Sequence, residues 1–256
     1  MRFLAVGDVL VDVTATGREH DASVRLAPGG SATNAALEAV RAGAEAELVG
    51  RVGDDAAGRM LRSEVEARGV RASLTIDPDR PTGTFLVVDC EVRVDRGANA
   101  GFLPEYLPPV LEADATLVSG HLPEETVHAV LERSRAPWNA LAAARLTQLP
   151  PGANAVFLNE TEARRLTDEG PADTLRLLGQ RYRLVCVTRG EDGAVGILDG
   201  EIAAAAAEPS LHTDASWGAG DAFAAAVLAA LATGAGIGDA LVAGCRAGAL
   251  ALSGRE

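Results

Sequence analysis

A glycine turn followed at once by a carboxylate is the strongest chemical signal in this sequence. Gly218, Ala219 and Gly220 are small, and the alanine-rich apolar run after Asp221 is typical of a buried helix. A turn that opens a helix directs several unpaired N–H groups at one point, and such a point binds phosphate. Asp221 at its edge could take a proton from an attacking hydroxyl. An ordinary helix N-cap is the alternative, and these four residues do not decide between the two.

Other stretches group glycines with polar side chains in a similar way. Together with Gly218–Phe223 they resemble the signatures of the ribokinase-like (PfkB-type) carbohydrate kinases, and they follow that family's order. These stretches are Gly29–Ala36 with Gly50–Gly58, Asn159–Glu162, and Thr188–Gly190. The resemblance extends from Arg2 to about Ala251. Each motif alone is weakly specific, but four in this order are strongly specific.

The elements that must position these motifs follow from hydrophobic periodicity. Short apolar runs predict strands at 3–6, 48–49, 116–120, 155–158 and 184–187, with 194–197 as an edge pair. Helices are predicted at 31–41, 54–68, 124–133 and 241–252, with Ser31 and Asp54 as N-caps, and 203–207 favours helix by propensity. This alternation predicts an α/β fold: a doubly wound, mostly parallel sheet sandwiched by helices, which binds ligands at the carboxyl ends of its strands. Asn159, Thr188 and the Gly218 turn fall at such ends.

Two segments, 14–27 and 72–99, suggest a separate small sheet. The second is rich in β-branched and turn residues and has no helical pattern between its strands. The resemblance implies a ribokinase-like lid over the sugar, within a single domain that spans residues 1–256, and a homodimer through the lid. The turn Asp89–Glu91 makes the lid hairpin short. Region 136–151 lacks the aspartate-ended strand and long connection of relatives, which leaves the middle strand open.

Composition excludes several classes of function. The chain has 256 residues and 23 basic side chains, all of them arginine, so a Walker A lysine, a Schiff-base lysine and a lysine base are absent. A net charge of −13 argues against nucleic-acid and anionic-membrane partners. Three scattered cysteines predict neither disulfides nor a zinc site. The short apolar run at the N-terminus is not a signal peptide, and no segment is long enough to span a membrane, so we expect a cytoplasmic protein.

For the transferred phosphate, the resemblance implies ATP as donor and Mg²⁺ as its ion. Asp221 would be the base, and the amides of Gly218, Ala219 and Gly220 would hold the developing charge. The nucleotide side would be formed by four further residues: Thr188 and Gly190 in the nucleotide loop, and Asn159 and Glu162 around Mg²⁺ through water.

For the acceptor, the resemblance implies a small sugar or nucleoside. The expected binding residues are Asp12, Gly29, Gly30 and Asn34, to which we add Asp8 and Arg96. Asp8 could instead be a solvated turn residue. Arg96 could be a surface arginine, although it is placed to meet an anionic substituent.

Two functions therefore remain for this sequence. The first is an ATP-dependent kinase that phosphorylates a primary hydroxyl of a small sugar or nucleoside. The second is a non-catalytic, nucleotide- or sugar-binding member with a regulatory role. The trimmed lid and the short region after Arg135 favour this second function, whereas the retained Asp221 argues against it. No Gly-x-Gly-x-x-Gly follows the first strand, which argues against a dinucleotide oxidoreductase.

The segment before the glycine turn departs from the resembled family. Asp214 is followed by three residues before Gly218, one more than is usual. Relatives use this segment and the C-terminal tail to bind K⁺, so the changed register and the end at Glu256 lead us to expect activity that is indifferent to K⁺. The alternative is a local bulge, with Trp217 over the nucleotide and the ion site preserved.

Overall fold

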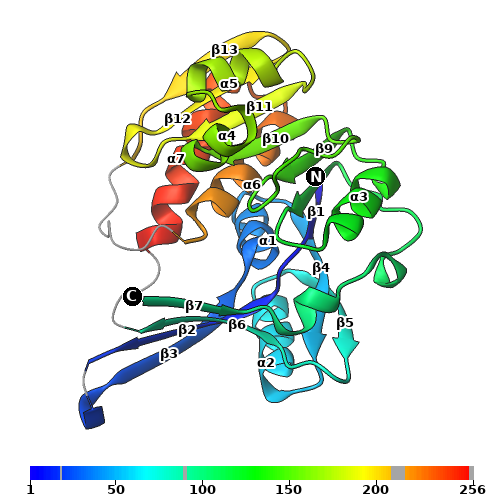
Figure 1. Cartoon of the computed structure of the whole chain (residues 1–256), viewed down its shortest axis with the longest axis vertical. Helices are drawn as coiled ribbons and strands as arrows, with labels where there is room; N and C mark the ends of the chain where they lie inside the picture. The colour runs from blue at the N-terminus through cyan, green and yellow to red at the C-terminus, as the bar shows by residue number, and fades with distance from the viewer. Residues whose placement is uncertain (18, 89–90, 209–216, 254–256) are drawn as a thin grey trace.

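The computed structural model describes residues 1–17, 19–88, 91–208 and 217–253. Asp89, Cys90 and the segment Asp214–Ser216 lie outside the described residues, so the expectation about K⁺ stays a prediction. The strands form two sheets, and Figure 1 shows the smaller one extending from the side of the larger body. The strands are β1 Arg2–Val6, β2 Leu10–Thr16, β3 Ser23–Gly29, β4 Glu45–Gly53, β5 Arg71–Asp77, β6 Gly83–Val88, β7 Glu91–Asp95, β8 Ala115–Ser119, β9 Trp138–Ala142, β10 Ala155–Asn159, β11 Leu184–Thr188, β12 Ala194–Leu198 and β13 Glu201–Ala205.

The larger sheet has nine strands in the order β13-β12-β11-β10-β9-β8-β1-β4-β5. Pairing is parallel from β5 through β11 and antiparallel for β12 and β13 at one edge. The chain runs outward from β1 in both directions, so the order reverses between β1 and β8. Ligands bind at such a switch point in open α/β sheets. The predicted doubly wound, mostly parallel sheet is confirmed.

Helices cover both faces of this sheet. The helices are α1 Ser31–Arg41, α2 Ala56–Ala67, α3 Glu124–Arg133, α4 Glu160–Thr167, α5 Pro171–Leu178, α6 Ala219–Ala232 and α7 Ile237–Ser253, with short 3₁₀ turns η1 Glu19–Asp21, η2 Gly97–Gly101, η3 Pro104–Tyr106 and η4 Gly190–Asp192. Along β1, Phe3 and Ala5 join the core under α1, α2, α6 and α7, whereas Leu4 and Val6 join the core under α3. Both faces of the sheet are therefore buried, as the continuous apolar run predicts.

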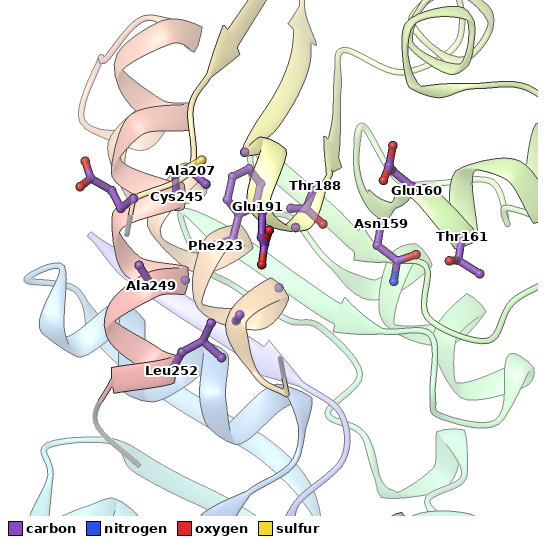
Figure 2. Close-up of a pocket in the computed structure, with 17 residues that line it drawn as sticks. Asn159, Glu160, Thr161, Thr188, Glu191, Ala207, Phe223, Cys245, Ala249 and Leu252 are labelled. Atoms are coloured by element: carbon purple, nitrogen blue, oxygen red, sulfur yellow. The ribbon is translucent and has the colours of Figure 1, made fainter. Parts of the chain in front are cut away.

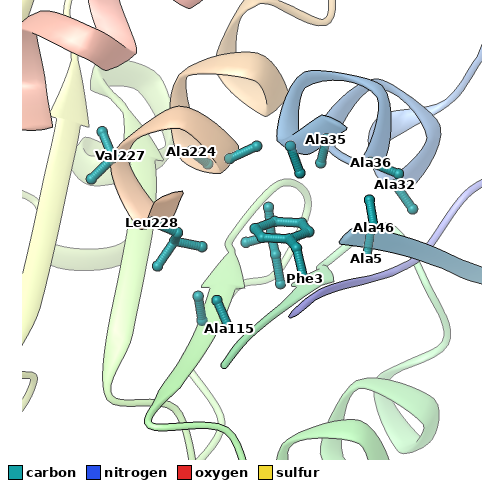
Figure 3. Packing of buried hydrophobic residues seen from close by; sticks show 14 of the residues in the cluster. Phe3, Ala5, Ala32, Ala35, Ala36, Ala46, Ala115, Ala224, Val227 and Leu228 are labelled. Atoms are coloured by element: carbon teal, nitrogen blue, oxygen red, sulfur yellow. The ribbon is translucent and has the colours of Figure 1, made fainter. Parts of the chain in front are cut away.

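Small side chains dominate the contact between α1 and α6. Figure 3 shows alanines of α1 and α6 gathered around the ring of Phe3 in the core. Ala35, Ala36 and Ala224 are fully buried there. Because alanine has only a methyl group, the two helices can pack closely over the sheet. Their N-terminal ends are thereby brought to the switch point.

The smaller sheet is the lid, with strand order β3-β2-β6-β7. Our expectation for segment 72–99 is wrong at its start: residues 72–77 lie in β5, which pairs parallel to β4 at the edge of the larger sheet. The alternation in β5 fits either sheet, so sequence pattern alone could not separate them. Segment 14–27 lies within the lid, but its strands also include Leu10–Val13 and Pro28–Gly29.

Three further expectations change. The predicted helix at 203–207 is a strand, because Asp199 and Gly200 both have positive φ (47° and 91°) and form a tight hairpin turn that pairs β13 with β12. The middle strand left open by the sequence is β9, which pairs parallel with β8 and β10. The N-caps are Gly30 and Asp55 rather than Ser31 and Asp54. None of the described helices has the length and apolar character needed to cross a bilayer, and a cytoplasmic location stays a prediction.

Asp55 links the larger sheet to the lid. Its carboxylate accepts hydrogen bonds from the Gly58 amide at 2.8 Å, as N-cap of α2, and from the Thr82 amide and hydroxyl at 2.7 and 2.6 Å. Thr82 directly precedes β6. Burial would raise the pKa of Asp55, but the bonds from Thr82 and Gly58 outweigh it and hold the pKa below its usual value.

We expect Asp55→Asn to lower the free energy of unfolding by roughly 0.5–2 kcal/mol at neutral pH, because the amide cannot accept all three bonds. A depressed pKa stabilises the fold above the unfolded-state pKa, and this contribution is lost as pH falls through the folded-state value. Urea unfolding at several pH values should show the difference between native and variant shrinking below about pH 4. Asp54→Asn, at the neighbouring exposed position, is the control. A constant difference at all pH values would contradict this role.

Candidate active site

A cavity of about 670 Å³ lies at the carboxyl ends of β10 and β11, between η4 and the helices α6 and α7 (Figure 2). Its walls contain many glycines and alanines together with polar side chains from the strand ends. The lining residues are Asn159, Glu160, Thr161, Thr188, Gly190, Glu191, Gly193, Ala207, Glu208, Ala219, Gly220, Phe223, Gly244, Cys245, Gly248, Ala249 and Leu252. The volume is within the range of small-molecule and cofactor sites.

The N-terminal end of α6 forms one wall of this cavity. Gly218 is the N-cap and has a left-handed backbone (φ 79°), which glycine adopts without strain. The first amide to bond back along the helix is that of Ala222, to the Gly218 carbonyl at 3.0 Å. The preceding helical amides, those of Ala219, Gly220 and Asp221, therefore lack an intrahelical acceptor. Ala219 and Gly220 line the cavity, so this end of α6 is suited to hold an anion there.

Asp221 joins the N-terminal ends of two helices. Its Oδ2 accepts a hydrogen bond of 3.1 Å from Nδ2 of Asn34, which lies in the first turn of α1. These residues are 187 positions apart in sequence, and both were predicted as site residues. An amide donor on one oxygen orients the carboxylate. The carboxylate is therefore held in a fixed direction at the edge of the glycine turn.

Asn159 and Glu162 form a capping box at the start of α4. The Asn159 side chain accepts from the Glu162 amide at 2.8 Å, and the Glu162 carboxylate accepts from the Asn159 amide at 3.0 Å. Burial raises the pKa of Glu162. Asn159 pairs in register with Thr188 on β11, so the two side chains lie together at the cavity mouth. Glu162 follows Asn159 in the first turn of α4, but it does not line the cavity.

Glycines on the lid side let the chain pack against the carboxyl group of Asp12 and the backbone of Asp8. A Cβ at Gly29 would lie 1.8 Å from Oδ1 of Asp12, and a Cβ at Gly30 would lie 2.3 Å from the carbonyl oxygen of Asp8. Gly30 also has a positive φ of 91°. The structure thus brings Asp8, Asp12 and the start of α1 together, one helical turn from Asn34.

Asp8 is not a solvated turn residue. Its side chain is buried and accepts a hydrogen bond from Arg96 at 3.1 Å as part of an ion pair. Burial raises the pKa of Asp8, and attraction from Arg96, His121 and Arg145 opposes this rise. Arg96 is therefore not a free surface arginine.

The buried side-chain amide of Asn99 fixes the backbone around this ion pair. The side chain of Asn99, which is fully buried, bonds to both the amide and the carbonyl of Val9, each at 2.9 Å, and to the carbonyl of Arg96 at 3.0 Å. Asn99 therefore clamps the turn after β1 to the turn after β7. Sequence reasoning named this stretch but missed Asn99, because a clamp across 90 residues leaves no local pattern.

Sequence reasoning also missed the wall that α7 contributes to the cavity. Gly244, Cys245 and Gly248 line it, and a Cβ at Gly244 would lie 2.6 Å from the ring of Phe223. Glycines spaced four apart on a helix were the available signal, since they mark a face that another group approaches closely.

Trp217 differs from its expected place. Its ring packs edge-on against Phe85 of lid strand β6, with centroids 5.3 Å apart, and it does not line the cavity. The suggestion that Trp217 lies over the nucleotide is therefore wrong. The contact instead joins the lid to the residue that precedes the glycine turn.

Comparison with known proteins agrees with this geometry. The model of the pfkB family carbohydrate kinases matches residues 2–256. A fructokinase from Klebsiella pneumoniae is 28% identical over 93% of this chain and 86% of its own length. An ATP-dependent ribose-1-phosphate kinase from Halopiger xanaduensis is 28% identical over 100% of this chain and 93% of its own length.

A solved structure shares the fold. The crystal structure of adenosine kinase from Sinorhizobium meliloti superimposes with a TM-score of 0.83 at 21% identity, covering 98% of this chain and 93% of the other. The relatives are thus kinases of sugars and nucleosides, and the family model covers nearly the whole sequence. The chain belongs to the pfkB family of carbohydrate kinases.

Proposed function

We propose that this kinase transfers the γ-phosphate of ATP to a primary hydroxyl of a small sugar or nucleoside, with Asp221 as the base. The observation that carries the proposal is the N-terminal end of α6. The first residues of this helix, Ala219 and Gly220, line the cavity, and the Asp221 carboxylate beside them accepts a hydrogen bond from Asn34. Donor and acceptor groups would thus meet at one helix end.

The two ends of the cavity suit different parts of a nucleotide. Its α7 wall is made of small and apolar groups, including Gly244, Gly248 and Leu252, which suit the flat faces of a base. Its other end has the amides of α6, which suit phosphates. Thr188 and Gly190 also line the cavity, and we assign them to the nucleotide loop. A relative named as ATP-dependent supports ATP as the donor.

Mg²⁺ fits the donor set at the cavity mouth when held through water. Among the described residues no group of three or more His, Cys, Asp or Glu side chains could hold a metal directly. Mg²⁺ keeps several waters and is commonly bound through one or two carboxylates plus substrate phosphates. Glu162 uses one carboxylate oxygen in the capping box, and Asn159 lines the cavity. These two residues would hold the ion, which would neutralise phosphate charge.

The transfer step follows from the placement of Asp221. Its carboxylate accepts the proton of the acceptor hydroxyl, and that oxygen bonds to the γ-phosphorus. The bond to the oxygen that bridges the β- and γ-phosphates breaks, and ADP leaves. A positioned base contributes roughly 10²–10⁴ in rate, and an aimed anion-hole donor roughly 10²–10³. The α6 amides should therefore matter as much as Asp221.

The lid supports a homodimer. Cross-strand pairing places Leu26 opposite Val13, and Val13 opposite Leu86, so these apolar side chains share one face with Val24 and Val88. Val24 and Leu26 are 59% and 57% exposed. An apolar sheet face of this kind is suited to pack against the same face of a second copy.

Asp221→Asn tests the base. We expect kcat to fall by roughly 10²-fold or more, with ATP affinity unchanged, because the amide is nearly isosteric but cannot accept the proton. Turnover and nucleotide binding are measured on the same preparation across a panel of sugars and nucleosides. Asp239→Asn, in the exposed first turn of α7, is the control and should retain full activity. Unchanged kcat in Asp221→Asn would remove this residue from the base role.

Gly244→Ala tests the nucleotide cavity. The added Cβ would lie 2.6 and 2.7 Å from Phe223 and Val227, so the Phe223 ring or α7 must move. We expect the Kd for ATP to rise roughly tenfold or more. Gly238→Ala makes the same change in α7, where no heavy atom lies within 4 Å of the new Cβ, and should bind ATP normally. Equal affinities in the two variants would argue against this cavity as the nucleotide site.

Light scattering tests the dimer. We expect a mass of about twice 26.2 kDa for the native chain and a monomer for Leu26→Asp, because a buried carboxylate at the interface is costly. Val110→Asp, at an exposed apolar position outside the lid, is the control and should remain dimeric. A monomeric native chain at micromolar concentration would contradict the dimer.

A further inference from the structure

Cationic side chains from separate elements surround the carboxyl group of Asp8 at the switch point. Asp8 follows β1, His121 follows β8, Arg145 follows β9, and Arg96 follows lid strand β7. The pKa of Asp8 responds to all three of these partners, although burial outweighs them and raises it. The chain as a whole carries 36 acidic and 23 basic side chains, so convergence of two arginines and a histidine on one carboxyl group is not expected from composition.

This charge cluster adjoins the base. The hydroxyl of Ser31, at the start of α1, donates to the hydroxyl of Ser119 at 2.7 Å, and Ser119 accepts from the His121 amide at 3.2 Å. Asn34 lies one turn further along α1 and bonds to Asp221. A group held by the cluster would therefore lie beside the helix that orients the catalytic carboxylate.

The loop that carries Arg145 is held in shape. Ala144 has a left-handed backbone (φ 47°), which is strained for a residue with a Cβ. Arg165 of α4 donates to the carbonyl of Ala144 and, at 3.2 Å, to that of Leu146. Two bonds from one side chain thus fix the backbone on both sides of Arg145. On the opposite side, Asn99 fixes Arg96, so both arginines start from rigid backbone.

The charges in this cluster do not balance. Asp8 offsets the charge of Arg96, with which it is paired at 3.1 Å, but the Nε–H of Arg96 is buried without an acceptor. Arg145 makes neither an ion pair nor a hydrogen bond through its side chain with any residue in the described ranges. Burial lowers the pKa of His121, and attraction from Asp8 opposes this shift. Arg145 is exposed, so its guanidinium is accessible to a ligand on the acceptor side.

We propose that the acceptor substrate carries an anionic group, a phosphate or a carboxylate, that Arg145 binds with help from Arg96 while the acceptor hydroxyl faces Asp221. The inference rests on the kinase function proposed above and narrows its substrate class. Arginine donates two parallel hydrogen bonds to either anion, so the fork of Arg145 would match both groups. A neutral sugar offers this guanidinium fork no matching anion.

The experiment compares matched acceptors. One neutral sugar, its phosphate monoester and its carboxylic acid are each assayed for kcat/KM with ATP in excess. We expect kcat/KM for one of the two anionic acceptors to exceed that for the neutral sugar by roughly tenfold or more. The phosphate and carboxylate arms show which anion the site takes. In Arg145→Gln, the ratio of kcat/KM for the anionic acceptor to kcat/KM for the neutral sugar should fall by roughly tenfold, because KM for the anionic acceptor rises. Arg145→Lys should restore part of this ratio.

Arg164→Gln removes one exposed arginine from α4 and is the charge-matched control, which should keep the native preference. Equal use of neutral and anionic acceptors by the native enzyme would overturn the inference while leaving the kinase function intact. A loss of kcat in Arg145→Gln for all acceptors alike would also overturn it, since the arginine would then serve the phosphate of ATP. Transfer to no acceptor, with ATP bound, would instead reject the proposed function.

Discussion

The close approach of α1 and α6 is the constraint on which the candidate site depends. Asn34 and Asp221 can share a hydrogen bond only if the two helices lie in near contact over the sheet. The alanines at their interface allow this, because any longer side chain would separate the helix axes. Gly244 of α7 likewise allows close packing, since Phe223 of α6 occupies the space that a Cβ at this position would need. Small residues thus set the positions of the amides and the carboxylate that chemistry requires.

The acceptor side is organised by a different kind of interaction. Buried polar groups there are satisfied across long sequence separations, as Asn99 is by Val9 and Arg96. Removing one partner of such a set leaves the others buried and unpaired, which costs more than the bond itself contributes. The set is therefore held in one arrangement, with the lid turn and the turn after β1 fixed relative to each other. A substrate that enters this site meets groups already in place.

Local patterns predicted the parts of the molecule that local patterns determine. The alternation of short apolar strands with helices was sufficient to predict a parallel sheet with polar groups at its carboxyl ends. Residues 72–77 were misassigned because an alternating strand suits either sheet, and only pairing with β4 decides. Residues 203–207 were predicted as helix from alanine propensity, which is weak beside the hairpin turn that pairs β13 with β12. The Asn99 clamp and the α7 wall are tertiary features without a sequence period.

The two sides of the site deal with negative charge by different means, which matters in a chain with a net charge of −13. At the nucleotide side, backbone amides and a hydrated ion can meet the triphosphate without any cationic side chain, so the absence of lysine costs nothing there. Glu191 and Glu208 can even line that cavity. On the proposed acceptor side, side chains would meet the charge of an anionic substituent, and arginines whose backbone is fixed by Asn99 and Arg165 are in position to do so.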